Sequence, residues 1–247
     1  MIPYFSYTQI HLGPITLYTW GLFIGLAFLA GYLWALKEGK KQGLEEKTIF
    51  WLSLAIFAGA IVGSRLAYVL QFPARYFSSP GEIFNLAGGL TFYGGLGGAL
   101  FFGWLYIWRN KLNFLKIADL MAPAAALGIF IGRIGCFLIN DHQGAPTNLP
   151  WAIHWSDGIL RHPVALYLSL NGLILFLILL FLKRKLKEPG QPALVFLIYY
   201  AASRFLLDFT RASGTTLSDP RYLNLTISQW ISLVILIVIL FYLRKRR

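Results

Sequence analysis

Charged residues are scarce in this chain of 247 residues. Only 13% are Asp, Glu, Lys or Arg, about half the share of an ordinary soluble domain, whereas 57% are hydrophobic. This composition excludes a disordered chain and argues against a water-soluble globule. Cysteine is almost absent too. The single Cys136 excludes a disulfide framework and a thiolate metal site, and we interpret it as an inert core thiol. We expect no metal and no cofactor.

Acidic residues are outnumbered by basic ones, ten against 22, which gives a formal net charge of +12. A nucleic-acid partner would need a soluble basic domain to carry that charge. None is visible, so we expect no nucleic-acid partner. What the chain has in abundance is apolar runs. Seven of them approach the length of about 20 residues that crosses a bilayer as a helix: residues 15–36, 48–71, 86–108, 117–140, 163–182, 192–210 and 228–243.

We therefore predict an all-α, polytopic membrane protein with seven transmembrane helices in a single domain over residues 1–247. Fifteen basic residues fall in the connections after the first, third and fifth spans and in the C-terminal tail, against four in the opposite segments. Under the positive-inside rule this places the N-terminus outside and the C-terminus in the cytoplasm. The two longest connections, 141–162 and 211–228, then form a small cap on the outer side.

Three arginines remain inside the predicted spans: Arg65, Arg133 and Arg204. An arginine at membrane depth costs at least about 2.5–3.5 kcal/mol, so it needs a partner, a wet cavity or a function. All three fall in the outer half of their spans. Guanidinium groups gathered there suit an anionic lipid headgroup, because their planar fork matches phosphate oxygens. Two structural alternatives stay open: Arg204 forms an internal ion pair with Asp208, or Arg65 extends to the interface.

The third span begins with glycines on both sides of Tyr93, and Gly94 and Gly95 follow it directly. A nucleotide-binding loop would need a strand before the glycines and a soluble βαβ unit after them, and neither is predicted. Close helix packing through small residues explains most of the pattern. A functional role stays open for Tyr93, because it is a polar side chain in the predicted outer half of the membrane.

Several segments together resemble one enzyme family. Residues 132–137, Gly-Arg-Ile-Gly-Cys-Phe, followed by Asn140 and Gly144, resemble the signature of the prolipoprotein diacylglyceryl transferases. Further similar segments occur in order along nearly the whole chain: Gly-Pro-Ile at 13–15, Trp20-Gly21, 63–70, 88–95, Arg161-His162-Pro163, and Arg204-Phe205 with Asp208-Phe209 and Arg211.

The resemblance implies a seven-span enzyme of the bacterial plasma (inner) membrane. Such enzymes move the diacylglyceryl group of phosphatidylglycerol onto the thiol of a lipobox cysteine in a prolipoprotein signal peptide, and release glycerol phosphate. Arg133 matches the essential arginine of the signature, and Arg211 matches the arginine that ends the motif of the sixth span. We expect Arg133, Arg211 and Tyr93 to be catalytic. The expected substrate-binding residues are Arg65, Arg204, Asp208, Asn140, Trp20, Gly94, Gly95 and His162.

The chemistry is consistent with these residues. A leaving phosphate gains charge, which fixed guanidinium groups stabilise well in a low-dielectric site. The chain departs from the family pattern at Tyr93, where the family has His, and at Trp20, Cys136 and Asp208. Our hypothesis is that Tyr93 orients the phosphate or relays a proton, which leaves the base that activates the thiol unassigned.

Two other functions stay open. The departures permit a divergent paralogue with another acceptor. A non-enzymatic carrier of an anionic lipid or small anion is the second alternative. A carrier predicts polar residues through the full membrane depth, whereas the inner halves of most spans are nearly pure hydrocarbon. This one-sided polarity favours a site that faces the outer leaflet.

Overall fold

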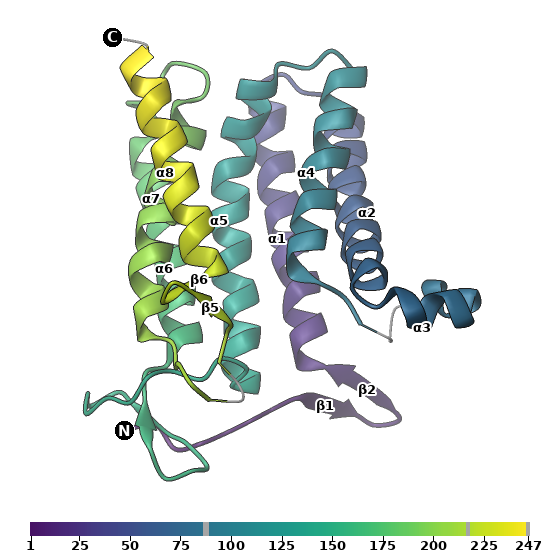
Figure 1. The fold of residues 1–247 in the computed structure, drawn as a ribbon. Helices are drawn as coiled ribbons and strands as arrows, with labels where there is room; N and C mark the ends of the chain where they lie inside the picture. The colour runs from purple at the N-terminus through teal and green to yellow at the C-terminus, as the bar shows by residue number, and fades with distance from the viewer. Residues whose placement is uncertain (86–88, 216–217, 246–247) are drawn as a thin grey trace. The chain divides into compact units, whose positions relative to one another are not determined.

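The computed structural model describes residues 1–85, 89–215 and 218–245, which are mostly helical (Figure 1). Gly88, the start of the third predicted span at residue 86, Arg246 and Arg247 lie outside the described residues. The helices are α1 (Thr19–Lys41), α2 (Glu46–Gln71), α3 (Pro73–Ser78), α4 (Phe92–Arg109), α5 (Phe114–Ile139), α6 (Val164–Leu182), α7 (Gln191–Leu207) and α8 (Ile227–Lys245), with short 3₁₀ turns η1 (Pro80–Phe84) and η3 (Asp208–Thr210).

Six helices of the described chain are long and apolar enough to cross a membrane: α1, α2, α5, α6, α8, and α7 with its continuation to Thr210. Helix α4 also has 18 residues, but it is not one of these six candidate spans. Its glycines and tryptophans contribute little to hydropathy, and it ends on Arg109. The structure thus supports a multi-pass membrane protein with six candidate spans.

Most helices begin and end within three residues of the predicted spans, and two differ more. Helix α1 begins at Thr19 rather than at 15, because strand β2 (Ile15–Tyr18) pairs with β1 (Gln9–Leu12) in an antiparallel hairpin. Gly13 turns this hairpin with a positive φ of 60°, which glycine adopts at little cost. Helix α4 begins at Phe92, six residues after the predicted start.

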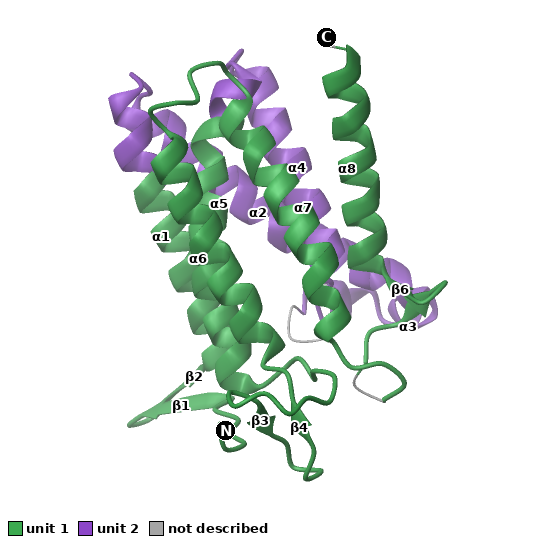
Figure 2. Ribbon diagram, turned by 90° about the vertical axis from the view of Figure 1, so that its left-hand side faces the viewer, with its two compact units in different colours: residues 1–34, 118–247 green, residues 35–117 purple. Residues whose placement is uncertain are grey.

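The chain divides into two compact units, residues 35–117 and residues 1–34 with 118–247 (Figure 2). In the first, α2 and α4 pack along their lengths. Glycines permit this: a Cβ on Gly63 would meet the Gly94 carbonyl oxygen, and a Cβ on Gly98 would meet that of Gly59. The small-residue packing predicted for the third span is therefore present. The single domain over 1–247 stays a prediction.

The larger unit holds α5 to α8 and most of α1. Its core includes Ala122 and Ala126 of α5 and Leu175 and Leu179 of α6, against which Tyr199 of α7 packs. The Asp119 carboxylate, near the start of α5, accepts hydrogen bonds from two backbone amides at the start of α7, at 2.6 and 3.0 Å. An acid at a helix N-terminus satisfies free amides and complements the helix dipole.

At one end of this unit, the connections 141–162 and 211–228 are joined by backbone hydrogen bonds. Gly144 and Arg211 form an antiparallel bridge, Ala145 donates to the Thr210 carbonyl and Ala212 donates to that of Gln143. Two short hairpins complete the layer: β3 (Ile153–His154) with β4 (Leu160–Arg161), and β5 (Arg221–Tyr222) with β6 (Leu225–Thr226). This layer brings polar residues from two distant loops to the ends of α5 and α7.

Candidate functional site

The C-terminal end of α5 brings His142 back onto Arg133. Asn140, directly after the helix, has a positive φ of 52°, a left-handed conformation that asparagine tolerates better than most residues. The chain reverses there, so that Arg133 Nη1 lies 3.0 Å from His142 Nε2. A residue inside a helix and a residue in the following loop therefore meet directly.

Asp141 completes this contact on the other side of the imidazole. Its Oδ2 lies 2.9 Å from His142 Nδ1. The close contact with His142 lowers the pKa of Asp141, against the opposing effect of burial. Burial lowers the pKa of His142, and the charges of Arg211 and Arg133 lower it further, while Asp141 acts in the opposite direction. The net result favours a neutral imidazole beside an ionised carboxylate.

A second cluster surrounds the fully buried carboxylate of Asp208 in η3. Its Oδ1 lies 3.1 Å from Arg204 Nη2 and 3.8 Å from Arg211 Nη1. Its Oδ2 accepts a hydrogen bond of 2.5 Å from the Thr226 hydroxyl. The spacing of four residues between Arg204 and Asp208 places both on one helical face. The internal ion pair that the sequence left open is therefore present, and it includes Arg211.

Arg211 links the two clusters. Its Nε lies 2.7 Å from Asp219 Oδ2, and its backbone carbonyl accepts a hydrogen bond from Arg221. Burial lowers the pKa of Arg211, and the charges of Arg204 and Arg133 lower it too. Arginine nevertheless remains charged at neutral pH. The positive charges of Arg204 and Arg133 therefore repel that of Arg211 within this unit.

Several buried donors in this region lack a hydrogen-bond acceptor within the described part of the chain, among them Arg204 Nη1, Asn140 Nδ2 and His142 Nδ1. A buried donor without a partner costs about 1–3 kcal/mol, and more when it is charged. Such groups are retained where a ligand or water supplies the acceptor. An anion with several oxygens would satisfy both the unpaired donors and the excess of guanidinium groups.

Trp20 and His162 lie in the same unit. The Trp20 side chain interacts with the Cys136 thiol, as does Arg133, so Trp20 reaches the signature segment. His162 Nδ1 lies 3.1 Å from the Tyr167 hydroxyl, and burial lowers the pKa of this imidazole. Its backbone amide donates to the Ala145 carbonyl, which ties the start of α6 to the loop that carries His142.

The remaining predicted site residues belong to the unit of residues 35–117. Arg65 is buried and donates from all three of its nitrogens to backbone carbonyls: Nε to Ile83 at 2.8 Å, Nη1 to Gly89 at 2.9 Å and Nη2 to Glu82 at 2.6 Å. It thereby fixes the segment that leads into α4. This geometry favours a positioning role for Arg65, whose binding of substrate stays a prediction.

Tyr93 is the second residue of α4 and is partly exposed, with its ring against Phe92. Gly94 and Gly95 follow it on the face that packs against α2, where a Cβ on Gly94 would meet Ala67. Close packing therefore accounts for Gly94. Direct contacts of Tyr93, Gly94 and Gly95 with substrate stay predictions.

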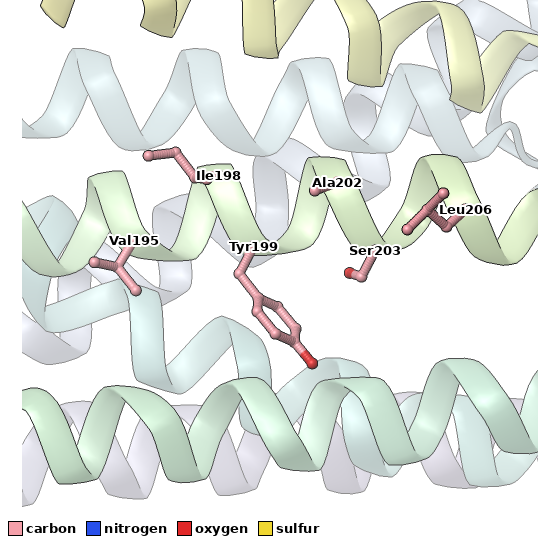
Figure 3. Close-up of a pocket in the computed structure, with 6 residues that line it drawn as sticks. All are labelled: Val195, Ile198, Tyr199, Ala202, Ser203 and Leu206. Atoms are coloured by element: carbon pink, nitrogen blue, oxygen red, sulfur yellow. The ribbon is translucent and has the colours of Figure 1, made fainter.

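An apolar groove of about 470 Å³ runs along α7 (Figure 3). Tyr199 and Ser203 extend to the same side of the helix, where Tyr199 packs against α6 and Ser203 accepts a hydrogen bond from Asn171. Arg204 lies on the same helix, between the lining residues Ser203 and Leu206. Its lining residues are Val195, Ile198, Tyr199, Ala202, Ser203 and Leu206.

His142 was not among the predicted site residues. His142 and His154 lie in the same loop but have no ligand-like spacing, and a contact with Arg133 across nine residues follows no helical period. The one available signal was the polar run 140–144 directly after the signature arginine. Within the described residues, no group of three or more His, Cys, Asp or Glu could hold a metal ion.

Comparisons with known proteins place this chain in a family. Residues 8–244 match the family model described as prolipoprotein diacylglyceryl transferase. A phosphatidylglycerol–prolipoprotein diacylglyceryl transferase from Bordetella avium is 36% identical, covering 99% of this chain and 97% of its own length. Proteins with the same name from Finegoldia magna and Nitratidesulfovibrio vulgaris are 37% and 33% identical, over 88% and 96% of this chain and 86% and 92% of their own. The chain therefore belongs to the prolipoprotein diacylglyceryl transferase family.

Proposed function

We propose that this protein transfers the diacylglyceryl group of phosphatidylglycerol to the lipobox cysteine thiol of prolipoproteins and releases glycerol phosphate. The observation that carries the proposal is the pair of arginines, Arg204 and Arg211, around the buried Asp208 carboxylate, with Arg204 Nη1 unpaired. A phosphodiester supplies the anionic oxygens that such a group binds. The family and the names of the relatives supply the reaction.

In this reaction the substrate sulfur bonds to the glyceryl carbon, and the bond between that carbon and the phosphate oxygen breaks. The leaving glycerol phosphate takes the electron pair, so negative charge grows on phosphate. Arg133 and Arg211 would hold this phosphate and stabilise the growing charge. Arg204 would support them, and Asp208 would keep Arg204 and Arg211 in place. Removing one such fixed donor typically costs about 100- to 1,000-fold in turnover.

The other predicted residues would complete the site. Asn140 offers its unpaired amide to donor or acceptor, and Trp20 would contact substrate beside the signature segment. His162 would help bind substrate at the start of α6. From the unit of residues 35–117, Tyr93 would orient the phosphate or relay a proton, with Gly94 and Gly95 beside it. Tyr93→Phe would then lower turnover, and full turnover by this variant would exclude that role.

The proposal places the protein in the bacterial inner membrane with seven spans. Helix α4 would be the seventh, since 18 residues at 1.5 Å per residue reach about 27 Å, close to the thickness of the bilayer core. The basic connections favour an outside N-terminus, a cytoplasmic C-terminus and an active site facing the outer leaflet. The groove along α7 would accept an acyl chain of phosphatidylglycerol, because it is apolar and lies on the helix that carries Arg204.

Purified protein given phosphatidylglycerol and a synthetic lipobox peptide would test the proposal through glycerol phosphate release. We expect release that requires the peptide cysteine and falls at least about 100-fold in Arg133→Ala. Arg109→Ala, at the end of α4, is the matched control and should retain the rate. Release without the cysteine would favour a paralogue with another acceptor, and movement of lipid without any release would favour the carrier.

A further inference from the structure

The proposed reaction needs a base that the arginines cannot supply. A free thiol has a pKa near 8.5, so only a few per cent is thiolate at pH 7. Guanidinium groups stabilise a thiolate once it exists, but they carry no free electron pair to accept its proton. A neutral imidazole beside the phosphate-binding group would accept it.

Among the described histidines, His142 is the one whose ring meets an arginine of the cluster. His162 Nδ1 faces the Tyr167 hydroxyl, and His154 is exposed on β3. The side chain of His142 is only 16% exposed. Its location against Arg133 brings it to the group proposed to hold the phosphate.

The partners of His142 define which nitrogen accepts a proton. Nδ1 lies 2.9 Å from Oδ2 of Asp141, and this negative charge favours the neutral tautomer that carries its proton on Nδ1. Nε2 then presents its electron pair, which Arg133 Nη1 approaches at 3.0 Å as a donor. This is the arrangement of a carboxylate that orients an imidazole base.

The charged groups around His142 come from several elements. Arg133 of α5 and Arg211 of the 211–228 connection lower the pKa of the imidazole, and Asp141 raises it. Asp219 is paired with Arg211 at 2.7 Å. Behind the loop, Arg161 of β4 is paired with Asp157 and donates to the Gly144 carbonyl. Since burial adds to the lowering, the ring is neutral at pH 7.

We propose that His142 is the general base of the reaction. Its Nε2 takes the proton of the substrate thiol, the sulfur forms its bond to the glyceryl carbon, and the carbon–oxygen bond to phosphate breaks with its electron pair on the phosphate. The proton then passes from the imidazolium to a phosphate oxygen of glycerol phosphate. This inference rests on the proposed function, because it assigns a residue to that same reaction.

The contact with Arg133 links the base to lipid binding. As long as Arg133 Nη1 donates a hydrogen bond to His142 Nε2, the electron pair of Nε2 is occupied and does not accept a proton from the thiol. A bound phosphodiester is the better acceptor for a guanidinium, since it is charged. Arg133 therefore turns to the phosphate when lipid binds, and Nε2 becomes free for the thiol. The base is exposed only when the donor lipid is in place.

His142→Gln tests this role, since glutamine can still accept a hydrogen bond from Arg133 but does not act as a base. The full-length protein would be assayed with phosphatidylglycerol and a lipobox peptide from pH 7 to pH 9. At pH 7 we expect roughly a 100- to 10,000-fold lower turnover, with little change in KM for phosphatidylglycerol. As pH approaches the thiol pKa of about 8.5, solvent generates the thiolate and the gap to the unsubstituted protein should narrow.

His154→Gln is the matched control and should retain the full rate at every pH. A His142→Gln variant with full turnover at pH 7 would overturn the proposal. A deficit of the same size from pH 7 to pH 9 would also overturn it, because it would indicate that His142 only supports the loop. Failure of the unsubstituted protein to release glycerol phosphate would instead contradict the proposed function itself, and the base with it.

Discussion

Arg133 and His142 meet at 3.0 Å although one belongs to a helix and the other to the loop that follows it. The left-handed Asn140 between them makes the contact possible. A guanidinium, an imidazole and the Asp141 carboxylate thus form a row at the outer end of α5 in the proposed topology. The second cluster around Asp208 adds two more guanidinium groups.

Arg133→Lys tests whether the planar shape of the guanidinium matters beyond its charge. Lysine offers a point charge on a flexible stem and does not bind two phosphate oxygens in parallel. We expect kcat/KM for phosphatidylglycerol to fall by roughly 100-fold, as for the loss of one fixed donor. Arg109→Lys, outside the clusters, should leave kcat/KM unchanged. Equal kcat/KM values for Arg133→Lys and the unsubstituted protein would show that charge alone suffices.

Asp208→Asn should lower both stability and turnover. The carboxylate is fully buried between Arg204 and Arg211, and loss of one partner of a buried ion pair costs about 3–5 kcal/mol. Thermal unfolding in detergent would show a lower Tm. Asp208→Glu keeps the charge and should recover part of both losses. Glu46→Gln, which breaks the exposed pair with Lys40, should change Tm little.

The helices were largely predictable because an apolar run of span length leaves few alternatives. Sequence alone did not predict the strand at residues 15–18, since its apolar residues continue the hydrophobic run of α1. Of the site, Arg133 and the Arg204–Asp208 pair followed from the cost of charge in lipid and from helical spacing. The contact of His142 with Arg133 could not be predicted in this way, because it depends on the left-handed conformation of a single residue, Asn140. The carbonyl contacts of Arg65 likewise depend on a loop that hydrophobic patterns do not describe.

Gly98→Ala tests the packing of α2 against α4. An added Cβ would meet the carbonyl oxygen of Gly59, whereas nothing lies within 4 Å of a Cβ on Gly97. We expect a lower Tm for Gly98→Ala, because backbone cannot move aside as a flexible side chain would. Gly97→Ala gains up to about 1 kcal/mol of helix propensity and should keep or raise Tm. The same Tm for both variants would contradict close packing at Gly98.

Asp141→Asn tests the partner of the proposed base through the acid side of the pH–rate profile. The acid limb follows protonation of His142, whose pKa is held below its usual value of 6.5 chiefly by burial. Asp141 raises that pKa, so its removal should lower the pKa further and move the acid limb to lower pH. Turnover on the plateau should fall by roughly 10- to 100-fold, because the amide no longer fixes the proton on Nδ1 and the ring loses its orientation. Asp157→Asn, on the same loop but paired with Arg161, should leave the acid limb where it is. An acid limb that moves to higher pH in Asp141→Asn would contradict the assignment of that limb to His142.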